Sequence, residues 1–165
     1  EQELSDFPDQ DHVVVWGRDG QADAGEARSR ATSGVISGTS FLTGDNFVSP
    51  AGNAAEAQNR FKSMFSNTDI IRAAERGGIF KAQINSNLPR AANVYRLTDG
   101  SSEYIAVFNF SSLPSGFKID LGDDHASYNI RELWSGEEFT AEESMKVRIS
   151  GGDAALYEIT EQVSE

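Results

Sequence analysis

The chain contains no cysteine, only 4 prolines and no long apolar run. Without cysteine, neither a disulfide framework nor a thiolate zinc site can form. Without an apolar run of about 20 residues, no segment reads as a membrane-spanning helix. Basic residues are also scarce: 14 Lys and Arg stand against 26 Asp and Glu, a formal net charge of −12. Such a charge repels nucleic acid and anionic membranes, so we expect neither as a partner.

A start without Met, on the polar residues Glu1 to Asp6, lacks the basic and apolar parts of a leader peptide. We therefore expect a mature product or a fragment. The 165 residues, 38% of them hydrophobic, suffice for one domain or two small ones.

The residue pattern changes at Gly77-Gly78, and before this point it is helical. A buried strand is predicted over residues 12–16, followed by a helix that Asp23 caps. A second strand over 40–45 and a second helix over 54–64 follow, and a short helix ends at Gly77. Strand, helix, strand, helix is a βαβα order, which predicts parallel strands.

After Gly78, β-branched and aromatic residues dominate and short apolar segments alternate with turn residues. Residues 104, 106, 108 and 110 alternate with 105, 107 and 109, the period of two that strands show. Regular strands with Gly, Asp, Ser and Pro turns predict an antiparallel β-sandwich over residues 79–165. We therefore expect an α+β chain in which a short βαβα segment over 1–78 precedes the sandwich. The predicted strands cover residues 79–83, 92–97, 103–110, 116–121, 127–133, 138–140, 144–149 and 154–159.

Several motifs occur in an order that resembles the C-terminal end of retaining α-galactosidases of the melibiase clan. Asp9-Gln10-Asp11-His12 resembles the Asp-x-Asp segment after the seventh barrel strand, with Gln10 in place of the usual Pro and His12 in place of Met. Other matching segments lie along most of the chain: Gly38–Asp45, Ser66–Ile71, Tyr104–Phe110 and Leu133-Trp134-Ser135-Gly136.

This resemblance implies that residues 1–78 are the last βα elements of a (β/α)8 barrel and residues 79–165 the C-terminal β-sandwich. The parent would be a retaining glycosidase for α-galactoside-like sugars, secreted or periplasmic, needing no cofactor. Its two catalytic carboxylates would lie on earlier strands, so no catalytic residue is expected here. Asp11 would bind a sugar hydroxyl, with Asp9 and His12 in support, and no metal ligand is expected.

The same resemblance implies two kinds of partner, the remainder of the catalytic barrel and a galactoside-like carbohydrate, and a homo-oligomer is possible. Galactose, N-acetylgalactosamine and arabinopyranose specificities all occur on this scaffold, and the motifs do not select one. A free-standing carbohydrate-binding or structural β-sandwich module is the alternative, with Trp134, Tyr95 or Tyr104 as stacking residues.

Several single residues are compatible with more than one role, in binding or in the structure. Trp16 fits sugar stacking and packing equally, whereas packing is favoured for Trp134. Asp45 fits a site-facing strand end or a loop cap. The acidic cluster near a turn fits a solvated loop better than a Ca²⁺ site, because the EF-hand spacing is absent; it comprises Glu137, Glu138, Glu142 and Glu143.

Overall fold

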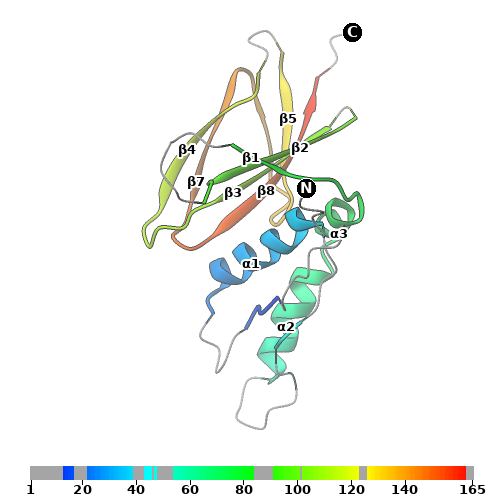
Figure 1. Cartoon of the computed structure of the whole chain (residues 1–165), viewed down its shortest axis with the longest axis vertical. Coiled ribbons are helices and arrows are strands. Elements are labelled where there is room, and N and C mark those ends of the chain that lie inside the picture. Colours follow the sequence, from blue (N-terminus) through cyan, green and yellow to red (C-terminus); the bar gives the residue numbers. More distant parts are fainter. Residues whose placement is uncertain are drawn as a thin grey trace, which may run out of the picture.

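The structure is a computed structural model that describes residues 13–16, 22–38, 43–45, 47, 54–83, 91–100, 102–122 and 126–162. Within these residues the chain forms three helices and eight strands, with the helices first in the sequence. Figure 1 shows the helices gathered at one side of a twisted β-sandwich, with α1 running beside β8.

Helix α1 spans Ala24–Ser37 and begins where the sequence predicts. The Asp23 side chain accepts a 2.7 Å hydrogen bond from the backbone N–H of Glu26, which satisfies a donor that the first helical turn leaves open. Gly38 ends the helix with φ of 68°, the left-handed conformation that glycine adopts without a Cβ clash. Local capping residues therefore fix both ends of this helix.

Helix α2 spans Ala54–Phe65 and helix α3 spans Thr68–Glu75. The side chain of Asn67 caps α3 by accepting from the backbone N–H groups of Asp69 and Ile70. Its amide nitrogen also donates 2.8 Å to the carbonyl of Leu133 in the sandwich. One residue thus starts a helix and attaches it to the sheet.

The eight strands predicted after Gly78 are confirmed, each with bounds shifted by a few residues at most. They pair antiparallel in a six-stranded sheet of order β1-β2-β3-β8-β5-β6 and a two-stranded sheet of β4 and β7. The strands are β1 Lys81–Gln83, β2 Val94–Asp99, β3 Ser102–Phe108, β4 Ser115–Asp120, β5 Tyr128–Glu132, β6 Glu138–Ala141, β7 Ser144–Ile149 and β8 Ala154–Glu161.

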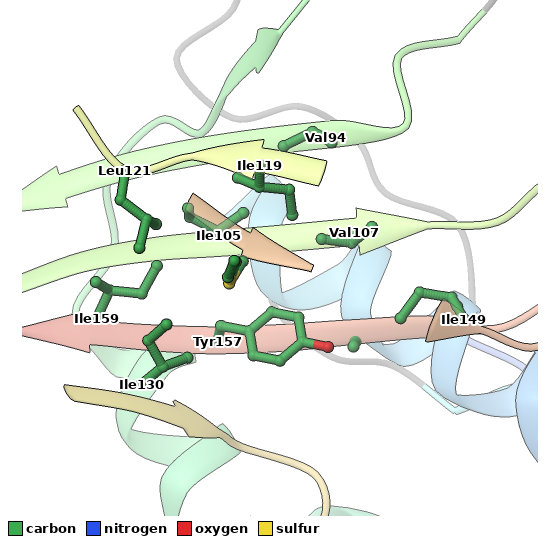
Figure 2. Close-up of a cluster of buried hydrophobic side chains, with 11 residues drawn as sticks. Val94, Ile105, Val107, Ile119, Leu121, Ile130, Ile149, Tyr157 and Ile159 are labelled. Carbon is green, nitrogen blue, oxygen red and sulfur yellow. The ribbon is translucent and has the colours of Figure 1, made fainter. Parts of the chain in front are cut away.

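The main core lies between the two sheets and is built by alternate residues of strands from both sheets. Ile105 and Val107 of β3 meet Ile119 and Met145 from the smaller sheet, all nearly inaccessible to water. Figure 2 shows these side chains converging from strands of both sheets. This packing confirms the β-sandwich that the alternating pattern predicts.

The opposite face of the large sheet is also buried, against the helices. Tyr104, Ala106 and Phe108 alternate with the sandwich-core residues along β3 and pack with Val35 of α1 and Ile70 of α3. The protein therefore has three layers: helices, the large sheet and the small sheet. The sequence pattern placed Phe110 in this strand, but β3 ends at Phe108, and Phe110 is 57% exposed.

The described residues before Gly77, which we call the N-terminal unit, have their own small apolar cluster. In it Val13, Val15, Ala27, Ala31 and Met64 are buried together. Val13 forms a parallel bridge with Thr43, so the segments before and after α1 lie side by side in the same direction, as predicted. The described residues form no closed barrel. Apart from this bridge, the predicted N-terminal strands are not formed in the described residues, because residues 14–16, 44 and 45 have no strand pairing; residues 12 and 40–42 lie outside the described ranges.

Candidate functional site

Hydrogen bonds join the two parallel segments of the N-terminal unit, residues 13–16 and 43–45, beyond the bridge between Val13 and Thr43. The Asp45 carboxylate accepts a 2.8 Å hydrogen bond from the backbone N–H of Val15 and a 3.0 Å bond from that of Trp16. The N–H of Gly44 donates to the carbonyl of Val13 across the same gap. Of the two roles that the sequence left open for Asp45, the structure shows the one in which it caps neighbouring backbone.

Two arginines hold the outer side of the Val13–Trp16 segment. Arg30 of α1 donates to the carbonyl of Val14, and Arg60 of α2 donates to the carbonyls of Val15 and Ala22. The Arg60 guanidinium also lies 4.4 Å from the centre of the Trp16 ring, a cation–π contact. The half-buried Trp16 is therefore engaged within the chain.

The predicted sugar ligands Asp9, Asp11 and His12 lie outside the described residues. The first described residue after them is Val13, which forms the parallel bridge to Thr43.

The two sandwich residues with the strongest sequence signal are structural. Trp134 packs between two apolar clusters and donates 2.9 Å from its indole nitrogen to the hydroxyl of Thr32. Tyr104 is 2% exposed and donates 2.5 Å to Glu158. Burial, and next the bond to Glu158, raise the pKa of the Tyr104 phenol, so it holds its proton. The buried Tyr104 ring is therefore closed to a sugar, and the partly buried Trp134 is engaged in packing, as the sequence favoured.

Two hollows lie on the surface of the described residues, and neither is lined by the Val13–Trp16 segment. The smaller, of about 240 Å³, is lined by side chains of α1 together with Tyr95, Phe108 and Phe110. The larger, of about 540 Å³, lies over β5, β6 and β8. The sequence named Tyr95 for stacking, but it gave no signal for the larger hollow, whose residues come together only through strand pairing.

Metal chemistry finds no support in the part of the chain that the structure describes. No group of three or more His, Asp or Glu side chains gathers there as a metal ion requires. Glu138, from the acidic cluster, pairs with Arg131 instead. Among the described helices, none has the length and apolar character to cross a lipid bilayer.

A β-sandwich with helices on one face is the class that these observations define. Residues 94–159, most of the sandwich, match the model of the alpha galactosidase C-terminal beta sandwich domain. The resemblance read from the sequence is thereby confirmed. No curated protein matches the chain by sequence.

Solved structures of glycoside hydrolases share the fold over most of the chain. A family 27 β-L-arabinopyranosidase from Geobacillus stearothermophilus superposes with a TM-score of 0.72 at 17% identity, over 90% of this chain and 33% of that enzyme. Alpha-galactosidase I from Mortierella vinacea gives 0.67 at 11% identity, over 88% of this chain and 38% of its own. An isomalto-dextranase from Arthrobacter globiformis T6 superposes with a TM-score of 0.66 at 17% identity, over 87% of this chain and 25% of that enzyme.

The chain spans between a quarter and two fifths of the length of these enzymes. Their different names, an arabinopyranosidase, a galactosidase and an isomalto-dextranase, show that one fold accompanies several sugar chemistries. In each of these enzymes the matched region is one part of a longer chain.

Proposed function

We propose that this chain is the C-terminal part of a retaining glycoside hydrolase that acts on α-galactoside-like sugars. The parallel bridge between Val13 and Thr43 carries the proposal. Two parallel segments joined through a helix are what one step of a βα barrel would contain, and here the joining helix α1 packs against a sandwich that matches the α-galactosidase C-terminal domain.

The proposal assigns the chain a supporting rather than a catalytic role. Retaining hydrolysis needs two carboxyl groups about 5 Å apart at the scissile bond. The described carboxylates nearest the strand ends serve the backbone: Asp23 caps α1, and Asp45 binds Val15 and Trp16. The isolated chain is therefore proposed to be inactive, with the catalytic pair supplied by the rest of the barrel.

Asp11 is the residue proposed to bind sugar in the complete enzyme, with Asp9 and His12 beside it. An ionised carboxylate accepts two hydroxyl hydrogen bonds, which suits a sugar ligand. We expect Asp11→Asn to lower kcat/KM on 4-nitrophenyl α-galactopyranoside by about 2 kcal/mol, roughly 30-fold.

The control is Glu161→Gln, which removes an exposed carboxylate at the end of β8 and should leave kcat/KM unchanged. If Asp11→Asn has the kcat/KM of the wild type, the proposal that Asp11 binds the sugar is wrong. Turnover of the glycoside by the 165-residue chain alone would contradict the supporting role itself.

We further propose residues 1–78 as barrel elements and 79–165 as a separate sandwich domain. A chain beginning at Gly78 keeps the inter-sheet core but loses the helices that cover Tyr104, Ala106 and Phe108. It should melt cooperatively and bind a hydrophobic dye through the uncovered face. If the shortened chain shows no cooperative transition, the proposed domain boundary at Gly78 is wrong.

A further inference from the structure

The helix-side face of β8 changes character along the strand. Ala154 and Leu156 are buried in the cluster beneath α1, whereas Glu158 and Thr160, further along the same face, are polar and half-buried. In Figure 1, β5 and the C-terminal end of β8 extend away from α1 and α2. The apolar face thus ends where the helical cover ends, and a polar face begins.

Strand pairing arranges this polar face as a grid. Asn129 of β5 lies between Thr140 of β6 and Thr160 of β8, and in the next row Arg131 lies between Glu138 and Glu158. Neighbouring positions are about 4.8 Å apart across the strands, and the rows are about 6.7 Å apart. The intervening Ile130 points into the inter-sheet core, so all six polar side chains share one face.

These six residues line the hollow of about 540 Å³, which we call the polar hollow. Helix α3 bounds it, because Asp69 accepts a 2.8 Å bond from Arg131, while Arg76 donates to Asp99 and lies 3.9 Å from Glu158. The charged row is thereby held in place before any ligand arrives, which lowers the ordering cost of binding.

The uncharged row, by contrast, keeps unused hydrogen-bonding capacity. Among the residues that the structure describes, neither threonine hydroxyl nor the amide nitrogen of Asn129 bonds to another group, while Gln162 donates 2.6 Å to the Asn129 oxygen. Both hydroxyls donate and accept, and the amide nitrogen donates. The hollow therefore offers alternating donors and acceptors over the width of three strands.

Charge narrows the class of ligand. An anionic ligand would be repelled by Glu138 and Glu158, because Arg131 is already paired with Asp69 and Glu138. A cationic ligand would be repelled by the guanidinium of Arg131 at the centre of the row. A neutral molecule that carries several hydroxyls avoids both repulsions and matches the mixed donors and acceptors.

We propose that the polar hollow is a non-catalytic binding site for a neutral sugar unit. The proposal goes beyond the function given above, because it uses the sandwich and α3 alone and does not depend on the barrel. Its position on the sheet is distinct from the Val13–Trp16 strand end, and its affinity is expected in the millimolar range typical of a few exposed hydrogen bonds.

The test uses the 165-residue chain, labelled with ¹⁵N, and titrates methyl α-D-galactopyranoside while amide shifts are recorded. Saturable shifts are expected at Asn129, Thr140 and Thr160. Asn129→Ala and Thr160→Val should each weaken binding by roughly tenfold without lowering the melting temperature. Thr98→Val, an exposed threonine of β2, is the matched control and should bind like the wild type.

Methyl α-D-glucopyranoside, galacturonate and galactosamine complete the series. A neutral sugar that binds more tightly than both charged ones supports the charge argument, whichever neutral sugar binds best. Three outcomes overturn the proposal: no saturable binding of either neutral sugar, saturable binding that survives both variants, or tighter binding of galacturonate or galactosamine.

Discussion

The indole nitrogen of Trp134 donates a 2.9 Å hydrogen bond to the hydroxyl of Thr32, which is wholly buried in helix α1. The two residues are 102 positions apart in the sequence. Trp134 also packs against apolar clusters on both sides of this bond, one shared with the sheet and one with the N-terminal unit. A single side chain thus joins the helical layer to the sandwich.

We expect Trp134→Phe to lower the free energy of unfolding by about 1–3 kcal/mol, because it leaves the Thr32 hydroxyl buried without this partner. Thr32→Val alone should cost a similar amount, since it leaves the indole N–H unpaired. The double variant should cost less than the sum of the two single variants, as urea denaturation can measure. Strict additivity would show that this bond does not couple the layers.

Asn109 is expected to be the most sensitive polar residue of the sandwich. It is 2% exposed, and its amide nitrogen lies 2.8–3.0 Å from three carbonyl oxygens. Asn109→Asp removes the donors and sets a carboxylate against these carbonyls, so a loss of about 3 kcal/mol or more is expected in urea denaturation. Asn59→Asp, exposed on α2, should change stability by less than about 0.5 kcal/mol. Equal effects of the two changes would contradict the burial argument.

Gly151 and Gly116 form a matched pair for a steric test. A Cβ at Gly151 would lie 2.4 Å from the backbone carbonyl of Ser112, whereas no described atom lies within 4 Å of a Cβ at Gly116. Gly151→Ala should therefore cost about 2 kcal/mol, because backbone must move, and lower the melting temperature. Gly116→Ala should be neutral or stabilise by up to about 1 kcal/mol, as for a glycine replaced within a strand. A neutral Gly151→Ala would show that the Ser112 loop moves freely.

Stability should fall in strongly alkaline solution because of two buried phenols. Burial raises the pKa of Tyr104, helped by its bond to Glu158, and burial raises the pKa of Tyr157, helped by nearby Glu132. Below about pH 10 both the folded and the unfolded states hold these protons. Above it the unfolded state loses them first, so unfolding becomes more favourable as the pH rises.

The measurement is the urea midpoint as a function of pH for wild type and for a variant with Tyr104→Phe and Tyr157→Phe. The double variant should be less stable at neutral pH but should lose less stability above about pH 10. Parallel curves for the two proteins would contradict the prediction.

Local sequence signals predicted the elements well, because caps and turns act over a few residues. Asp23, Asn67 and Gly38 determine helix ends by their own chemistry, and alternation along β7 determines its faces. Along β3 both alternating sets are apolar, at Tyr104 to Phe108, which is the pattern of a strand buried on both faces. That signal could have predicted the third layer.

The contacts between distant residues could not be predicted in the same way. Thr32 as the partner of Trp134, and the row of Thr140, Asn129 and Thr160, depend on the order of strands in the sheet and on where α1 lies. For the candidate sugar ligands, the family resemblance supplied the prediction for Asp11. Sequence reasoning was thus strongest on local structure and weakest on which surfaces meet.

The order of strands in the large sheet also determines at what stage of synthesis the complete sheet can form. Strands β1, β2 and β3 make one half, β5 and β6 make the other, and β8 lies between β3 and β5 as the element that pairs with both. During synthesis the two halves cannot unite until the segment Ala154–Glu161 has left the ribosome. Until then the unpaired backbone edges of β3 and β5 remain open to other chains, so newly made protein is most prone to aggregate just before β8 emerges.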